Sequence, residues 1–125
     1  KDVSLEHSLS SDLPVVLVDK GQIQQALINL VLNAIGATQA GGFVKVDTHY
    51  LPGKHQIHIS IADSGEGIAK ENLGTIFDPF FTTKEDGTGL GLSIVSRIIR
   101  EHGGRVELIS EEDRGTTFNI VLPLI

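Results

Sequence analysis

Two pairs of consecutive glycines, Gly41-Gly42 and Gly103-Gly104, divide this chain of 125 residues into alternating helical and extended segments. Glycine adopts the left-handed conformation that ends a helix without steric cost, so a glycine pair after a helical pattern predicts a helix end. The first pair follows a run that we expect to be helical from about residue 20 to residue 39, with Asp19 at the N-cap. The second pair follows apolar residues at helical spacing, which are Leu90, Ile94, Val95, Ile98 and Ile99.

Each glycine pair is followed by extended chain. The expected strands are residues 15–18, 43–50, 56–61, 105–110 and 116–122. The Pro52-Gly53 turn and the acidic turn at residues 111–115 make hairpins of the last four, which implies antiparallel pairing. A further short helical stretch is expected near residues 70–77. We therefore predict an α/β two-layer sandwich, in which a mixed, mostly antiparallel sheet packs against about three helices.

The composition is that of one domain over residues 1–125, because 40% hydrophobic residues can fill a core. A net charge of −6 removes the basic signal of a nucleic-acid-binding protein, so we expect no nucleic-acid partner. The absence of cysteine excludes disulfides and thiolate zinc sites. No apolar run approaches the roughly 20 residues that cross a bilayer, so we expect no direct membrane contact from this segment. From the lack of methionine we expect a piece excised from a longer protein.

Asn29 and Asn33 interrupt the otherwise apolar run Ala-Leu-Ile-Asn-Leu-Val-Leu-Asn-Ala-Ile. Residues four apart lie on one helix face, so the two amides form a polar stripe. A buried amide without a partner costs about 1–3 kcal/mol, and the stripe therefore needs partners. These are either neighbouring backbone or another chain, or else a ligand, with an amide oxygen available to a hard cation such as Mg²⁺.

The string Asp63-Ser-Gly-Glu-Gly-Ile68 directly follows an apolar strand. A carboxylate at a strand end can accept a hydrogen bond from an exocyclic amine. Glycines two and four residues later let the backbone approach a flat ring closely. An ordinary turn has the same pattern, and the string alone does not distinguish the two.

A second glycine-rich string, Gly87-Thr-Gly-Leu-Gly-Leu92, runs into the second predicted helix. Free N–H groups and the dipole at a helix N-terminus favour phosphate. The string is not a P-loop, because no Gly-Lys-Ser/Thr follows, and it lacks the third glycine of the dinucleotide fingerprint. A flexible hinge is the alternative. Lys84 lies just before the string and could offer its charge to a phosphate.

The order and spacing of these strings resemble the catalytic ATP-binding domain of sensor histidine kinases, a branch of the Bergerat-fold ATPases. Asn29-Leu-Val-Leu-Asn33 looks like the N box of that family, and Asp63-Ser-Gly-Glu-Gly67 looks like its G1 box. Phe77-Asp-Pro-Phe-Phe81 looks like the F box, Gly87-Thr-Gly-Leu-Gly-Leu92 like the G2 box, and Gly115-Thr-Thr-Phe118 like the closing strand. The resemblance covers residues 12–123 and looks closest to kinases of the nitrogen-regulation type.

The resemblance implies a role for each matching position. Asn33 would ligate the Mg²⁺ that bridges the phosphates of ATP, and Asn29 would support the same polar face. Asp63 would bond the adenine amino group, and Thr117 would reach adenine through water. The other implied nucleotide contacts are Gly65, Gly67 and Ile68 beside the ring, and Lys84, Thr88, Gly89, Leu90, Gly91 and Leu92 around the phosphates.

Two positions depart from the family pattern. Many members carry a basic residue three positions after the second asparagine, followed by an aromatic residue that stacks on adenine. Here these positions are Gly36 and Ala37. We expect weaker or more lid-dependent nucleotide binding than in members that have both, with Lys84 as the candidate replacement for the missing charge.

The family's phosphoacceptor histidine, in a His-Glu/Asp context followed by Asn/Thr-Pro, has no match in this chain. The five histidines are His7, His49, His55, His58 and His102. We expect His49, His55 and His58 to be solvent-facing, and His102 to make a dipole contact at a helix end. The resemblance implies a protein-histidine kinase domain that donates the γ-phosphoryl group of ATP to a separate dimerisation and phosphoacceptor domain, with little turnover alone. It further implies a response regulator reached through that domain and a cytoplasmic location, whether or not the parent protein is membrane-anchored.

Two other classes of nucleotide-binding protein are alternatives to a histidine kinase. An ATPase of the topoisomerase, mismatch-repair or heat-shock chaperone type uses a Glu at the position of Asn29 to activate water, and an amide cannot act as that base. A regulatory nucleotide-binding module, such as an anti-sigma-like serine kinase, would yield phosphoserine rather than acid-labile phosphohistidine. The four intact boxes argue against a degenerate binder.

Overall fold

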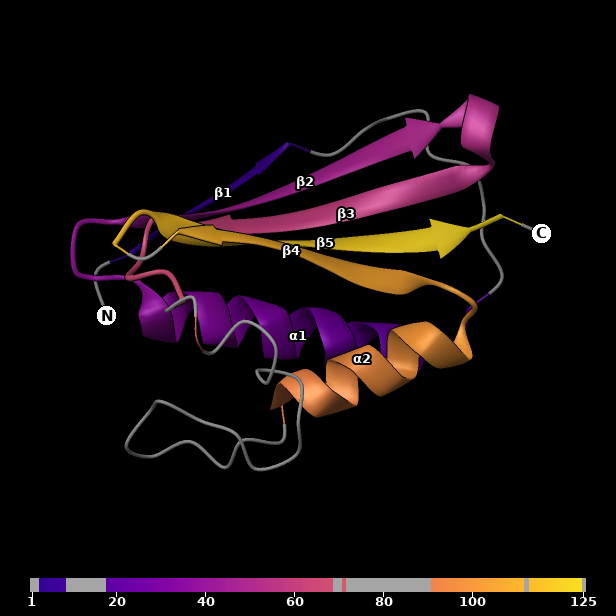
Figure 1. Cartoon of the computed structure of the whole chain (residues 1–125), viewed down its shortest axis with the longest axis horizontal. Coiled ribbons are helices and arrows are strands. Elements are labelled where there is room, and N and C mark those ends of the chain that lie inside the picture. The colour runs from indigo at the N-terminus through magenta and orange to yellow at the C-terminus, as the bar shows by residue number, and fades with distance from the viewer. Residues whose placement is uncertain (1–2, 9–17, 69–70, 72–90, 112, 125) are drawn as a thin grey trace.

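A five-stranded sheet and two α-helices form two layers in the computed structural model, which describes residues 3–8, 18–68, 71, 91–111 and 113–124 (Figure 1). The elements are β1 (Ser4–Ser8), α1 (Lys20–Ala37), β2 (Phe43–Leu51), the 3-10 turn η1 (Pro52–Lys54), β3 (Gln56–Asp63), α2 (Gly91–Glu101), β4 (Arg105–Glu111) and β5 (Gly115–Pro123). The strand order is β1-β2-β3-β5-β4. This confirms the predicted two-layer α/β class.

The sheet is mixed and mostly antiparallel, as predicted. β1 is parallel to β2, whereas the pairs β2–β3, β3–β5 and β4–β5 are antiparallel. The sequence did not predict β1, because all five of its residues are exposed and show no hydrophobic alternation. Of the strand expected at residues 15–18, only Val18 is described, and it is not in a strand. The third helical stretch expected near residues 70–77 lies outside the described residues except for Glu71.

Helix α1 begins where the sequence predicts. The Asp19 carboxylate accepts a hydrogen bond from the backbone N–H of Gln22 at 3.0 Å, which satisfies a free donor of the first turn. The helix ends at Ala37, two residues earlier than expected. There the buried Thr38 hydroxyl donates to the carbonyl of Ala34 at 2.7 Å. Gly41, at φ +89°, then turns the chain into β2.

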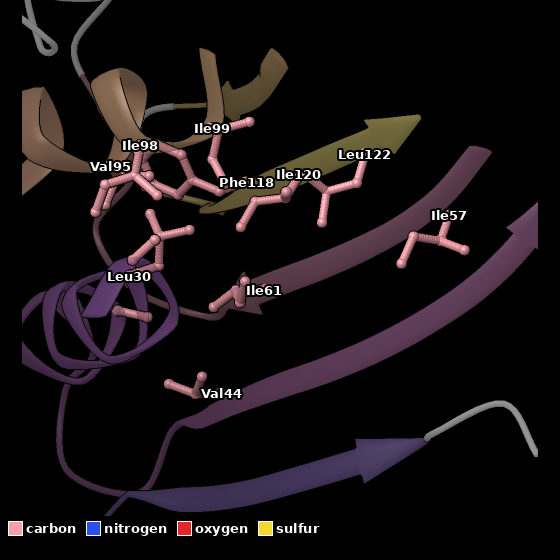
Figure 2. Close-up of a cluster of buried hydrophobic side chains, with 12 residues drawn as sticks. Leu30, Val44, Ile57, Ile61, Val95, Ile98, Ile99, Phe118, Ile120 and Leu122 are labelled. Carbon is pink, nitrogen blue, oxygen red and sulfur yellow. The ribbon is translucent and has the colours of Figure 1, made fainter. Parts of the chain in front are cut away.

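One face of the sheet is covered by both helices, and the core lies between the two layers (Figure 2). Helix α1 contributes residues spaced four apart, and α2 and the inward faces of the strands complete the layer. The buried members that Figure 2 labels are Leu30, Val44, Ile57, Ile61, Val95, Ile98, Ile99, Phe118, Ile120 and Leu122. The two helices run in opposite directions, so that the start of α1 lies beside the end of α2 (Figure 1).

The other face of the sheet carries a hydrogen-bonded polar cluster around Asn119. Its Nδ2 donates to Glu107 Oε1 and to His58 Nδ1, each at 3.1 Å, and its Oδ1 accepts from the Ser60 hydroxyl at 2.9 Å. His58 thus lies on the face of the sheet opposite the helices, as expected, but its ring is half-buried in this cluster. His58 Nε2 has no hydrogen-bond partner among the described residues, and burial lowers the pKa of the ring. His49 and His55 are exposed, as predicted.

Candidate functional site

Asp63 is a buried carboxylate at the last position of β3, with 7% of its surface exposed. Its Oδ1 accepts hydrogen bonds from the backbone N–H of Gly65 at 2.9 Å and of Thr116 at 3.3 Å. Burying a carboxylate is costly unless hydrogen bonds compensate, so these two donors fix both its position and its orientation. Asp63 and Thr116 are direct partners in the β3–β5 register.

The glycines after Asp63 are required by the packing of the chain itself. A Cβ atom at Gly65 would lie 2.3 Å from the carbonyl oxygen of Ala37, at the end of α1. The next residue, Glu66, donates its N–H to that same oxygen at 3.2 Å. Gly67 has φ +72°, which side chains rarely adopt. This packing accounts for Gly65 without a ligand, and clearance for an adenine ring at Gly65 and Gly67 stays a prediction.

Ser110 on β4 is a site-forming residue that the sequence analysis missed. Its hydroxyl accepts the N–H of Ile68 at 2.8 Å and lies 2.9 Å from the Thr116 hydroxyl. In addition, Asp113 donates its N–H to the carbonyl of Glu66 at 2.6 Å. The chain after Asp63 is therefore tied to the β4–β5 hairpin. The only sequence signal was a small polar residue at an inward-facing position of the alternating strand β4.

The register distinguishes the two adjacent threonines of β5. Thr116 pairs with Asp63 and is buried, whereas Thr117 pairs with Ala62 and is only half-buried. Because successive strand residues point to opposite faces, Thr116 and not Thr117 shares the face of Asp63. Thr116 therefore lies on the same face as the carboxylate, both threonines line a recess at this end of the sheet, and the Thr117 contact to adenine stays a prediction.

A recess of about 200 Å³ opens at this end of the sheet. It is lined by Asp63, Ile109, Ser110, Glu111, Arg114, Gly115, Thr116 and Thr117. Ligand pockets typically measure about 300–1,000 Å³, so the described residues alone form only part of a nucleotide-sized site.

Asn29 and Asn33 lie one turn apart on α1 and are half-buried, outside its fully buried stripe of Ala26, Leu30 and Ala34. Ala37 continues the face of Asn33 by one turn, and its carbonyl holds Glu66. The structure therefore places Asn33 at the same end of the molecule as the Asp63 string. Of the two departures from the family pattern, Gly36 is exposed and Ala37 is half-buried.

Helix α2 begins at Gly91, at the end of the helix pair where α1 terminates (Figure 1). Leu92 is half-buried and packs against the core. The first turn holds no acidic residue, so no side chain there opposes the favourable field of the helix dipole on an anion. Lys84, Thr88, Gly89 and Leu90 lie outside the described residues, as does the F-box string.

Within the described part of the chain, no group of three or more His, Cys, Asp or Glu could hold a metal ion. A single amide oxygen, such as that of Asn33, nevertheless fits Mg²⁺, which usually binds proteins through one or two oxygens and keeps waters and substrate phosphates as its other ligands. None of the described helices is both long and apolar enough to span a membrane.

Comparison with known proteins gives a consistent result. Residues 18–125 match the family described as histidine kinase-, DNA gyrase B-, and HSP90-like ATPase. The chain is 40% identical over 124 residues to sensor histidine kinase ZraS of Escherichia coli (strain K12), which covers 99% of this chain and 26% of that protein. It is 39% identical over 123 residues to sporulation kinase E of Bacillus subtilis (strain 168), covering 98% of this chain and 16% of that protein. The chain thus spans about a quarter or less of the length of these relatives.

Solved structures give the same fold. The catalytic domain of histidine kinase ThkA, in a nucleotide-free form, has a TM-score of 0.86 at 37% identity, over 98% of this chain and 80% of that one. Full-length ShkA in complex with AMPPNP has a TM-score of 0.87 at 36% identity, over 98% of this chain and 26% of that one.

Proposed function

Because the chain belongs to the histidine kinase-, DNA gyrase B-, and HSP90-like ATPase family, we propose that it binds ATP with Mg²⁺ and donates the γ-phosphoryl group to a histidine on a separate dimerisation domain. The observation that carries the proposal is the buried Asp63 carboxylate, which two backbone N–H groups hold at the end of β3. Identity to sensor kinases over nearly the whole chain supports the choice of reaction.

Asp63 is suited to select adenine. A carboxylate only accepts hydrogen bonds, so it complements the 6-amino donor of adenine and repels the 6-oxo acceptor of guanine. Thr116 carries the hydroxyl beside it and shares its face of the sheet, so Thr116 is placed to support the carboxylate. Ile68 donates its N–H to Ser110 and packs its side chain against the core, and we propose that it supplies apolar surface beside the ring.

The phosphates are proposed to lie between the end of α1 and the start of α2. Gly91 and Leu92 open α2, where the helix dipole favours an anion, and Asn33 offers an amide oxygen. Mg²⁺, when bound there, would neutralise charge on the β- and γ-phosphates. Since the chain has a net charge of −6, this neutralisation favours the binding of an anionic nucleotide.

Asn29 decides between transfer and hydrolysis. An amide cannot take a proton from water, so the site has no general base at the position where the ATPase alternative requires one. An imidazole needs no such base, because its unprotonated nitrogen is itself the nucleophile. That nitrogen attacks the γ-phosphorus, the bond to the β–γ bridging oxygen breaks, and ADP leaves. We therefore expect slow ATP turnover until an acceptor histidine is supplied.

The proposed partners follow from the relatives. A solved structure of histidine kinase ThkA is a complex with response regulator protein TrrA, and that chain is 34% identical to this one. We propose that this chain acts on its own dimerisation domain, that this domain passes the phosphoryl group to a response regulator, and that both steps take place in the cytoplasm, where ATP is available.

Isothermal titration tests the binding step. With Mg²⁺ present, the chain should bind ATP and discriminate against GTP, and chelation of Mg²⁺ should weaken ATP binding. Addition of a sensor-kinase dimerisation domain with γ-³²P-ATP should then label histidine on that domain, in an acid-labile form. ATP binding without any histidine label, or with phosphoserine, would refute the kinase assignment. Steady hydrolysis that an Asn29→Ala change abolishes would favour the ATPase alternative.

A further inference from the structure

The side chain of His102 joins the end of α2 to the start of α1. The backbone N–H of Asp19 donates to His102 Nε2 at 3.1 Å, across 83 positions of sequence, and His102 Nδ1 lies 2.7 Å from the carbonyl oxygen of Ile98. Because Nε2 accepts a hydrogen bond, it carries no proton, and Nδ1 is the protonated nitrogen that donates to Ile98. Only this tautomer of the neutral imidazole makes both bonds. His102 lies at the helix end as expected and bonds a carbonyl of the last turn, and it has a second partner that the sequence did not indicate.

Both partners of this bond are held within the ends of their helices. Asp19 is the N-cap of α1, and its carbonyl accepts the N–H of Ile23 at 3.0 Å while its carboxylate accepts that of Gln22 at 3.0 Å. On the other side, the N–H of His102 bonds the carbonyls of Ile98 and Ile99 at 3.2 and 3.1 Å. The bond therefore connects the N-cap of α1 to the residue that directly follows α2.

The apolar contact between the helices constrains their relative position along their axes less sharply than a hydrogen bond does. The fully buried residues of α1 are Ala26, Leu30 and Ala34. Larger apolar residues of α1 that are partly buried also pack against the core, namely Ile23, Leu27, Val31 and Ile35. Hydrophobic contact is non-directional and depends mainly on the area that is buried. A hydrogen bond has a preferred length and angle, and it can define the axial position that apolar contact leaves loose.

The opposite end of the helix pair holds the proposed phosphate site (Figure 1). Asn33 lies 14 residues after Asp19, or about 21 Å along α1 at 1.5 Å per residue, and Gly91 lies 11 residues before His102, or about 16 Å along α2. Because the helices are antiparallel, a shift at the His102 end changes the spacing between Asn33 and Gly91 directly. A misplacement of about 1 Å in a site of this kind can cost up to 10²-fold in rate.

We propose that His102 is a positioning residue that sets the axial register of α1 against α2, and thereby the spacing between Asn33 and the start of α2. The assignment of that spacing to ATP and Mg²⁺ rests on the proposed function. The register itself does not, so the two can be tested separately.

Two amide substitutions of His102 form a matched pair. His102→Gln places an amide near the position of Nε2 and can still accept from Asp19, whereas His102→Asn reaches only the position of Nδ1 and keeps at most the bond to Ile98. The chain has no cysteine, so cysteines introduced at the exposed positions Gln24 on α1 and Arg97 on α2 can carry spin labels specifically. The distance between the labels then reports the register without nucleotide, and the ¹⁵N spectrum of the wild-type imidazole reports the tautomer.

We expect an unprotonated Nε2 in the wild-type protein, and an Asp19 amide that exchanges with solvent on the order of 10-fold faster in His102→Asn than in His102→Gln. The label distance should shift or broaden in His102→Asn and stay at the wild-type value in His102→Gln. The Kd for Mg²⁺–ATP should rise roughly 3- to 10-fold in His102→Asn and about 2-fold or less in His102→Gln, the loss of one hydrogen bond setting the scale.

A protonated Nε2, or equal solvent exchange of the Asp19 amide in both variants, would show that the hydrogen bond from Asp19 to His102 is not formed. An unchanged label distance in His102→Asn would refute the proposal that His102 sets the axial register of the two helices. A shifted distance with an unchanged Kd would refute the link to the phosphate site. If the wild-type chain bound no ATP, the proposed function would fail, while the distance and exchange measurements would still decide the role of His102.

Discussion

Replacement of Gly65 by alanine should damage both the stability and the proposed ligand site. A Cβ atom at Gly65 would stand 2.3 Å from the carbonyl oxygen of Ala37 and 2.7 Å from its carbonyl carbon, both of which are backbone atoms at the end of a helix. Backbone cannot rotate away as a flexible side chain can, so the chain after Asp63 must move outward. Movement by about 1 Å would stretch the bond from Gly65 N–H to Asp63 Oδ1, which is 2.9 Å long.

The expected cost combines two effects. Overpacking of this kind destabilises by about 1–3 kcal/mol. A weakened hydrogen bond to a buried carboxylate adds about 1 kcal/mol or more. We therefore expect a loss of about 2–4 kcal/mol in the free energy of unfolding, or roughly 6–16 °C in Tm for a domain of this size.

Gly53→Ala is the matched control. Gly53 lies in the 3-10 turn before β3, a Cβ atom there would meet nothing within 4 Å, and its φ is not positive. This substitution should be neutral or should stabilise by about 0.4–1 kcal/mol, through the entropy of the unfolded chain. Urea unfolding of both variants, followed by circular dichroism, measures the difference.

The two variants also separate stability from binding. Without urea, and at a temperature where Gly65→Ala remains folded, its Kd for Mg²⁺–ATP should still be higher than that of the wild-type chain, because Asp63 has been displaced. Equal unfolding free energies for Gly65→Ala and Gly53→Ala would show that the Ala37 contact does not constrain the chain, and would remove the basis of this reasoning.

Three further predictions follow from the site and from the open face of the sheet. Asp63→Asn should raise the Kd for ATP on the order of 10-fold or more and reduce the preference over GTP, because an amide can also donate to a 6-oxo group; calorimetric titration of both nucleotides measures this. Thr116→Val should lower the free energy of unfolding by about 1 kcal/mol, through loss of the bond to the Ser110 hydroxyl, and should raise the Kd for ATP. Thr117→Val should change both quantities less. Larger effects in Thr117→Val than in Thr116→Val would show that the strand register does not determine which threonine supports Asp63. Burial lowers the pKa of His58 from 6.5 in the folded protein, so as the pH falls the unfolded chain binds a proton at His58 before the folded one does. The free energy of unfolding should therefore fall as the pH drops through 6.5 towards the lowered pKa. Urea unfolding at several pH values measures this, and this part of the pH dependence should disappear in His58→Gln.

Local patterns in the sequence predicted most of the fold. Asp19 before an apolar run and Gly41-Gly42 after it define α1, because capping and glycine conformation are properties of a few neighbouring residues. The hairpins follow from alternation on either side of short turns. β1 could not be predicted in this way, since its five exposed residues become a strand only by pairing with β2.

The parts of the site that depend on strand register were not predictable. The sequence places Thr116 and Thr117 next to each other, and only the pairing of Asp63 with Thr116 shows which of them shares the carboxylate's face. Ser110 was missed for the same reason, because its role depends on Ile68, 42 positions away. Likewise, the half-buried position of His58 follows from its contact with Asn119 on β5 and from no feature near it in the sequence.

The two ends of the helix pair differ in how the chain completes them. At one end, Asp19 and His102 bond to each other and to their own helices, so this end is closed by the protein alone. At the other end, α1 is capped by Thr38, and α2 opens at Gly91 with a first turn free of acidic side chains. A ligand with phosphates and Mg²⁺ at that end would complete it from outside, since the helix dipole and the Asn33 amide both favour such charges. Because the ligand binds only the folded chain, Mg²⁺–ATP at 100 times its Kd should raise the free energy of unfolding by about 2.7 kcal/mol. At the same nucleotide concentration, His102→Asn should be stabilised less, since its Kd is expected to be higher.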